Sequence, residues 1–373
     1  MSFEIAQDDL QVLRNAFDQQ QIALYLGAGV SAASGLPTWD KLILSVYFAA
    51  VSEQKLGNWR PFPNYLYAIS DWYLRARQEP LEITARKLRL LFDDDESGQQ
   101  RFLNAVRDAL YQIENQEGAA PPDVGSNDTL SAVAEFCAAP RPDTSGVKSV
   151  VTYNYDNLLE RALKERGVIA QPIFTSSPAA DGKLPVFHVH GYIPFPESGQ
   201  PEPSGVVLSE EEYNEAASDP YSWSNLVQLR EMSGSVGVMV GLSMADRNIR
   251  RLLDALARSP VQAKIFALLK RPSPILPTAS EVDAIDDDAK AILTRFKKAG
   301  IKSRAQRKGP IGFERSATKS EQRYAREIRG IVEAVDALAL DQETRVLRAL
   351  GITPIWYDKH KEIGKILERI RNG

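Results

Sequence analysis

The chain has 373 residues, of which 43% are hydrophobic and 25% charged, a composition typical of globular proteins. Its formal net charge of −4 excludes the overall basic field by which many proteins attract nucleic acid. A single cysteine, Cys137, excludes an internal disulfide framework and a four-cysteine zinc ribbon, and we expect it to be a small buried hydrophobic residue.

The first apolar run, Ile22–Leu26, predicts a buried strand and leads directly into Gly27-Ala28-Gly29-Val30-Ser31. Glycine lets a main chain approach a phosphate closely, and a following helix offers free N–H groups. The same pattern also occurs in tight turns that only need a positive φ. The segment therefore favours a nucleotide site and leaves a purely structural turn open.

Five further apolar runs are typical of strands that are covered on both faces. They are Val147–Thr152, Val186–His190, Val236–Val240, Ile265–Leu269 and Ile352–Tyr357. Helical patterns lie between them, as after Asp246, where apolar residues recur at helical spacing. Alternating strands and helices predict an α/β fold with a doubly wound parallel sheet.

Two regions interrupt this alternation. Residues 51–146, with the acidic run Asp93–Glu96, are expected to form a helical insertion or subdomain. Residues 271–349 are expected to form a second insertion of loop and helix, so that 1–50, 147–270 and 350–373 make up the core. Within the second insertion, residues 301–330 hold nine Lys or Arg against three Glu. This basic segment is either a solvated helical face or a contact patch for an acidic partner such as nucleic acid.

Polar residues follow four of the predicted strands. Because ligands of open α/β sheets bind beyond the carboxyl ends of the strands, these residues predict one site for a polyphosphate ligand. A histidine among them would suit proton transfer near neutral pH. The four segments are Gly27–Ser31, Thr152-Tyr153-Asn154-Tyr155-Asp156, His188-Val189-His190-Gly191 and Gly241-Leu242-Ser243.

Structural roles for the same residues stay open. Asn154 and Asp156 are also suited to cap a helix that begins near Asn157, as Ser243 and Asp246 are for the next helix.

His188 and His190 lie two apart on a predicted strand, so we expect them on the same face. Such a pair can bind a metal, but no acidic residue stands beside it at ligand spacing. No metal site is therefore predicted.

In chain order, the four segments resemble the sirtuin signatures GAG-x-S, T-x-N-x-D, HG and G-x-S. The resemblance is to the bacterial sirtuin-like branch of antiphage defence, which has NAD hydrolases without a zinc ribbon. That branch shares the pattern Leu208–Tyr213, the G-x-S-x-x-D form of Gly241–Asp246 and a terminal strand like Ile355–Asp358.

Two departures from protein-deacetylating sirtuins disfavour an acyl-lysine substrate. The paired cysteines of their zinc ribbon are missing, and their P-x-F-R reads Pro37-Thr38-Trp39-Asp40, without the arginine. The motifs expected to bind NAD are left largely intact.

The resemblance implies a Rossmann-like core that binds NAD and breaks its nicotinamide–ribose bond. The amides of Gly27, Ala28 and Gly29 would bind the diphosphate, with Ser31 near the phosphates or ribose. Further NAD-binding residues would be Gly241, Ser243 and Asp246, with Ser243 supporting the adenosine half.

The resemblance also implies roles in catalysis. Asn154 would hydrogen-bond the ribose hydroxyls and position water, and Asp156 would shape the nicotinamide subsite. His190 would act as a general base or as a hydrogen-bond partner at the ribose, with His188 supporting it from behind.

With water as the acceptor, the implied activity is an NAD hydrolase that gives ADP-ribose and nicotinamide, regulated in antiphage defence. Two alternatives remain: an NAD-dependent protein deacylase or ADP-ribosyltransferase, and a non-catalytic subunit that binds NAD or ADP-ribose in an assembly. A homo-oligomer, a HerA-type ATPase or helicase and a phage-derived activator are the implied partners. The N-terminus lacks a signal architecture and no run approaches about 18 apolar residues, so a cytoplasmic location without membrane contact is expected.

Overall fold

A computed structural model describes residues 3, 5–56, 69, 72, 81–92, 97–113, 120–138, 146–197, 199–208, 212, 218–244, 246–261, 263–272 and 319–372. The acidic run 93–96, residues 301–318 of the basic segment and most of the pattern 208–213 lie outside the described residues. The chain divides into two compact units, one made of residues 1–270 and 349–373 and the other of residues 271–348.

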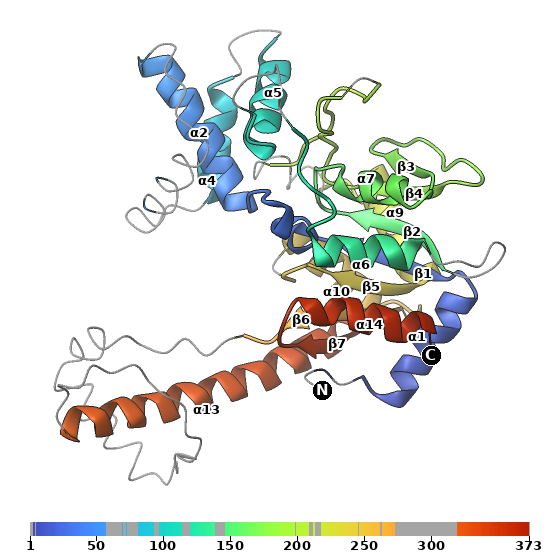
Figure 1. Ribbon diagram of the computed structural model, residues 1–373, viewed down its shortest axis with the longest axis vertical. Coiled ribbons are helices and arrows are strands. Elements are labelled where there is room, and N and C mark those ends of the chain that lie inside the picture. Colours follow the sequence, from blue (N-terminus) through green and yellow to red (C-terminus); the bar gives the residue numbers. More distant parts are fainter. Residues whose placement is uncertain are drawn as a thin grey trace. The chain divides into compact units, whose positions relative to one another are not determined.

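The first unit is built on a seven-stranded sheet in which every pairing is parallel (Figure 1). The predicted α/β fold with a doubly wound, Rossmann-like sheet is thereby confirmed. The strand order is β3-β4-β2-β1-β5-β6-β7. In chain order the strands are β1 (Ile22–Leu26), β2 (Val147–Thr152), β3 (Ala170–Ile173), β4 (Leu184–His188), β5 (Val236–Val240), β6 (Lys264–Lys270) and β7 (Ile352–Tyr357).

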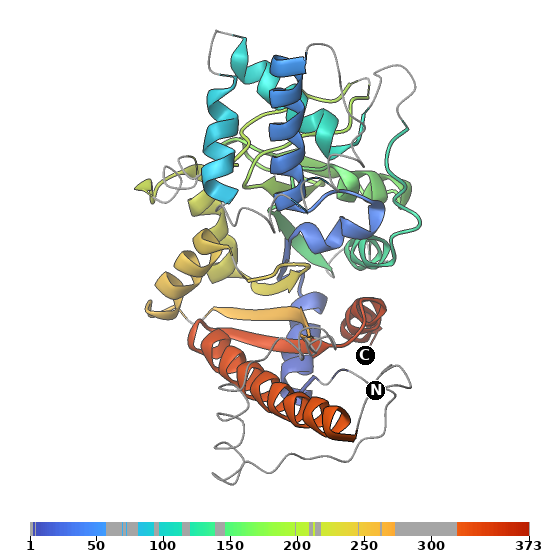
Figure 2. The ribbon, with the colours of Figure 1, turned by 90° about the vertical axis from the view of Figure 1, so that its left-hand side faces the viewer.

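Helices cover both faces of this sheet, as Figure 2 shows with the strands seen from the side. On one face α6 contacts α7 and α14, and α14 contacts α1; on the other, α9 contacts α10, β5 and β6. The helices of these layers are α1 (Gln7–Asp18), α6 (Asp128–Cys137), α7 (Leu158–Glu165), α9 (Trp223–Gly234), α10 (Arg247–Ala257) and α14 (Lys361–Asn372).

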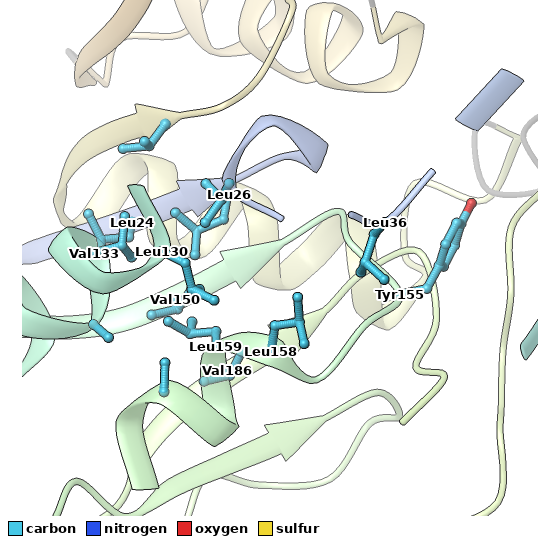
Figure 3. Packing of buried hydrophobic residues seen from close by; sticks show 14 of the residues in the cluster. Leu24, Leu26, Leu36, Leu130, Val133, Val150, Tyr155, Leu158, Leu159 and Val186 are labelled. Carbon is cyan, nitrogen blue, oxygen red and sulfur yellow. The ribbon is translucent and has the colours of Figure 1, made fainter. Parts of the chain in front are cut away.

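A cluster of buried hydrophobic residues lies between the sheet and the first helical layer (Figure 3). Leu24 of β1 and Val150 of β2 pack there against Leu130 and Val133 of α6, and all four side chains are fully buried. Burying an aliphatic side chain of this kind contributes about 1.5–3 kcal/mol. This packing explains why the strand sequences are continuously apolar, because the opposite face is covered as well.

Three helices of the first unit pack on one another, since α2 (Trp39–Leu56) contacts both α4 (Leu81–Leu90) and α5 (Gly98–Leu110). α6 also lies within residues 51–146, yet it packs in the layer that covers the sheet. Cys137, at the end of α6, is partly buried against the core, and burial raises the pKa of its thiol to about 12.

The order of the strands indicates at which edge of the sheet a ligand would bind. The chain proceeds from β1 to β2 on one side, whereas β5 pairs with β1 on the other side. The carboxyl ends of β1 and β5 therefore flank the point at which the sheet reverses its winding, where ligands of open α/β sheets bind. Gly27 follows β1 directly, and Gly241 follows β5.

In the second unit the structure describes the long helix α13 (Lys319–Ala349). An exposed ion pair joins Arg345 to Asp341 one turn away, and Val335 and Leu338 are more than half exposed. Among the described helices of both units, none is long and apolar enough to cross a membrane.

Candidate functional site

The glycine segment after β1 packs against the turn after β5. The Gly27 amide donates to the Val240 carbonyl at 3.1 Å, and the Gly29 amide donates to the Gly241 carbonyl at 3.0 Å. A Cβ atom at Gly27 would lie 2.6 Å from the Gly241 carbonyl oxygen, and one at Gly29 would lie 2.9 Å from the Gly241 Cα. The close approach of two backbones thus explains both glycines.

These contacts bear on the predicted diphosphate site. Two of the three amides expected to bind phosphate, those of Gly27 and Gly29, already donate to carbonyls of this chain. Only the amide of Ala28 has no acceptor among the residues that the structure describes, and Ala28 is exposed. A phosphate at this loop would therefore meet one free amide in the observed conformation, not three.

Asn154 lies beyond β2 and joins it to the glycine segment. Its Nδ2 donates to the Gly27 carbonyl and to the Ser31 Oγ, both at 3.1 Å. This contact with a carbonyl determines the orientation of the amide, because Oδ1 in its place would face another acceptor. Oδ1 is therefore left as an acceptor; it is buried and has no hydrogen-bond partner in the described part of the chain.

Asp156 completes a hydrogen-bonded chain from Asn154 through Ser31. The Ser31 hydroxyl, which accepts from Asn154, donates to the Asp156 carboxylate. The same carboxylate accepts from the Leu158 amide at 3.1 Å, at the start of α7. Burial raises the pKa of Asp156, opposed by its hydrogen bonds. Asp156 thus has the capping role as well as a place in the site.

His190 is buried beyond β4 and faces Asp246. Its Nε2 lies 4.0 Å from the Asp246 Oδ2, and its ring meets the edge of Tyr153 with the centroids 5.0 Å apart. Burial lowers the pKa of His190, and the nearby Asp246 carboxylate partly offsets this shift. The imidazole is thus held in its neutral form, which is the form that can accept a proton.

Asp246 has two roles at once. Its Oδ1 accepts from the Ile249 amide at 2.9 Å as the N-cap of α10, while its Oδ2 faces His190. The predicted cap is therefore confirmed, and the role of Asp246 in binding NAD stays a prediction. Ser243, in the same turn, is exposed.

The structure corrects the prediction for His188. β4 ends at His188, and the chain turns at Gly191, whose φ is +105° and whose amide donates to the His188 carbonyl at 3.3 Å. His190 therefore lies outside the strand, and the alternation that would place both histidines on one face has ended. His188 instead contacts Asn154 and Glu160 and does not support His190 from behind. Among the described residues, no group of three or more His, Cys, Asp or Glu is arranged for a metal.

Asn127 is a site residue that sequence reasoning missed. Fully buried, it donates through Nδ2 to the Val30 carbonyl at 2.8 Å and to the Ser34 Oγ at 2.9 Å. Its Oδ1 caps α6 by accepting from the Leu130 amide at 3.0 Å. An Asn before a helical pattern indicates a cap, but nothing in the sequence indicates that it also holds the segment after β1.

Replacing Asn127 with alanine is expected to destabilise the protein by about 2–3 kcal/mol, because a cap is lost and a buried carbonyl loses its donor. Asn127→Ser is the matched control, since serine keeps the cap but cannot reach Val30; we expect it to lose about 1 kcal/mol less. Urea unfolding measures both. Wild-type stability in the alanine variant would contradict the assigned contacts.

Asp40 stands where deacetylating sirtuins have arginine, and it has a structural role here. It lies in the first turn of α2, where a carboxylate interacts favourably with the helix dipole, and the Thr38 hydroxyl donates to it. The position is thus used to start a helix.

Comparison with known proteins gives two matches. A family model described as a SIR2-like domain matches residues 148–301, a range that contains Asn154, His190 and Gly241 but not the segment after β1. Defense-associated sirtuin 2 of Bacillus subtilis is 24% identical over 259 residues, which are 68% of this chain and 21% of that protein. The chain thus spans about a fifth of the length of this relative.

Proposed function

We propose that the chain is an NAD hydrolase of the sirtuin-like defence type, which cleaves the nicotinamide–ribose bond; the match of residues 148–301 to a SIR2-like domain and the similarity to a defence-associated sirtuin support this. The two matches confirm the resemblance that the four segments indicated. SIR2-like domains use NAD as a substrate, and the match to such a domain therefore supports an NAD-related enzyme.

The Asn154 amide is the observation that carries the proposal. Its Oδ1 is a buried acceptor, held in a defined direction by two hydrogen bonds from Nδ2. A buried acceptor without a donor is unfavourable by about 1–3 kcal/mol, so a ligand that donates there is favoured. A ribose hydroxyl of NAD is such a donor, and so is the water molecule that hydrolysis consumes.

The proposed reaction needs little covalent chemistry from the protein. The C–N bond between ribose and nicotinamide breaks, its electron pair leaves with the nicotinamide nitrogen, and the ribose carbon becomes an oxocarbenium ion. A water molecule positioned by Asn154 adds to that carbon, and His190 accepts the proton that the water loses. Asp246 stabilises the imidazolium that results.

The test is to incubate the purified chain with NAD, alone and with candidate partners, and to measure the products. Nicotinamide and ADP-ribose in equal amounts would support the proposal. Nicotinamide release that depends on an acyl-lysine peptide would indicate a deacylase. Binding of NAD without turnover under every condition would indicate the non-catalytic alternative.

A second test concerns the pH dependence of kcat/KM. We expect activity to fall only at a pH below the ordinary range of histidine, since burial lowers the pKa of His190 and protonation removes its function as a base. In Asp246→Asn the acidic limb should move to still lower pH, because the carboxylate raises the pKa of His190.

Asparagine caps a helix as well as aspartate does, so this variant removes the charge and keeps the cap on Ile249. The pH profile of kcat/KM for both proteins is the measurement. An acidic limb that stays in place or moves to higher pH would contradict the role of the pair.

A homo-oligomer and a regulating partner, such as a HerA-type ATPase or a phage-derived activator, belong to the same proposal. Regulation is required because unrestrained NAD hydrolysis depletes the cell. The basic segment 301–330 and the helices of residues 51–146 stay candidate interfaces for these partners.

A further inference from the structure

A buried histidine–glutamate hydrogen bond lies next to Asn154, and the proposed reaction does not use it. The His188 side chain is fully buried, and its Nε2 lies 2.7 Å from Oε1 of Glu160 on α7. Its Nδ1 lies 3.1 Å from the backbone carbonyl oxygen of Asn154. The second carboxylate oxygen of Glu160 is buried and has no partner among the described residues.

The hydrogen bonds determine where the protons are. A carbonyl oxygen only accepts, so Nδ1 of His188 must carry the hydrogen in its contact with Asn154. Nε2 faces a carboxylate, so a second proton lies between His188 and Glu160, on one partner or the other. Both ring nitrogens are thus engaged, and the imidazole has one orientation that satisfies both contacts.

The ring is also held by packing. Tyr192 meets it edge-on with the centroids 4.5 Å apart, and Phe174 stacks on Tyr192 at 5.1 Å. His188 therefore presents a rigid donor to Asn154 from the end of β4.

Every polar group of Asn154 except its Oδ1 has a partner in the chain. The amide N–H donates to the Thr152 Oγ1 at 3.1 Å, the carbonyl accepts from His188, and Nδ2 donates to Gly27 and Ser31. A residue held at its backbone N–H, its carbonyl and its side-chain nitrogen has little freedom to move the remaining oxygen.

We propose that His188 is a positioning residue: held by Glu160, it bonds the Asn154 carbonyl and so aims the Asn154 Oδ1 at the ligand. This inference rests on the proposed function, because the orientation of the Asn154 Oδ1 affects catalysis only if Asn154 contacts the ribose or the attacking water. A buried pair of this kind is weak as a source of stability, since hydrophobic residues of similar volume often serve as well. A positioning role would account for two buried polar side chains at this place in the fold.

Two substitutions of His188 separate the proposed role from packing. In His188→Asn the amide nitrogen takes the place of Nδ1 and can still donate to the Asn154 carbonyl, whereas the contact with Glu160 is lost. In His188→Gln the amide reaches the place of Nε2, so the contact with Glu160 is kept and that with Asn154 is lost. Glu160→Gln is a milder third variant, which keeps a hydrogen-bonding group beside Nε2.

The turnover number for NAD is expected to fall about 10²-fold in His188→Gln, with little change in KM, because loss of orientation acts on the reacting geometry. In His188→Asn it should fall by less than about 10-fold. Equal losses in both variants, or no loss in either, would overturn the inference.

A measurement without turnover keeps this inference separate from the proposed function. In asparagine-labelled protein, the side-chain amide of Asn154, assigned by its absence in Asn154→Ala, is expected to exchange slowly with solvent. Its exchange should be at least about 10-fold faster in His188→Gln than in His188→Asn, because only His188→Gln loses the hydrogen bond to the Asn154 carbonyl. If the wild type releases no nicotinamide but the exchange rates differ in this way, the proposed function fails and the positioning role stands. Equal exchange in the two variants overturns the positioning role whatever the activity.

Discussion

Replacing Asn154 with alanine is expected to lower the rate of nicotinamide release from NAD by at least about 100-fold, the loss typical when a reacting group is no longer oriented. The alanine removes the buried acceptor oxygen that would position the ribose or the attacking water. It also removes the two donors that tie the segment after β1 to the end of β2. Nicotinamide release under saturating NAD measures the effect.

Asn104→Ala is a suitable control for this experiment. Asn104 lies on α5, and within the described part of the chain its side chain accepts one surface hydrogen bond, from Gln100. The same deletion there should leave turnover unchanged. Urea unfolding of both variants shows how much of any loss comes from instability. Turnover within a few-fold of the wild type in Asn154→Ala would refute the assignment of this residue.

Gly241→Ala should strongly destabilise the first unit. Gly241 has a φ of +69°, a conformation that disfavours a side chain by about 1–2 kcal/mol. The added Cβ would also lie 2.7 Å from the Val30 amide nitrogen and 3.0 Å from the Gly29 carbonyl carbon. Overpacking of this kind costs about 1–3 kcal/mol, so a total of about 2–5 kcal/mol is expected.

Gly351→Ala separates the contribution of the positive φ from that of the steric contact. Gly351 has a similar φ of +77°, but a Cβ there would meet nothing within 4 Å. Only the conformational part, about 1–2 kcal/mol, should therefore be lost. The difference in unfolding free energy between the two variants, from urea titrations, measures the contact between the two turns. Equal losses would show that the backbones separate without penalty.

The apolar runs predicted β1, β2 and β5 with the bounds that the structure has, because strands covered on both faces must be continuously apolar. β3 was missed because its four residues are mostly half-buried and include Pro172, so neither periodicity nor propensity marks them. The predicted strand at Val186–His190 is displaced from β4, because Val189 continues the apolar pattern after the chain has begun to turn.

The candidate site, too, was predictable from the sequence only in part. That Asn154 and the glycine segment lie together was predictable, since parallel strands bring their carboxyl ends to one edge. The partners Asn127 and Glu160 were not, because each comes from a helix whose distance from the site depends on tertiary packing. A sequence motif also could not predict the internal hydrogen bonds of the Gly27 and Gly29 amides, because it gives the spacing of residues but not the acceptor that each amide faces.

The segment from Gly27 to Gly35 is bonded to other parts of the chain along its whole length, by Gly241 at one end, Asn127 in the middle and Gln112, which donates to the Gly35 carbonyl at 2.8 Å. The entropy of ordering this segment is therefore already included in the free energy of folding. A ligand that binds there as the segment stands would associate almost as with a rigid body, without the unfavourable entropy of ordering a loop. The affinity for the ligand would then depend on the few polar groups of the segment that have no partner. Substitutions that break the segment's hydrogen bonds would lower the stability of the protein even without ligand.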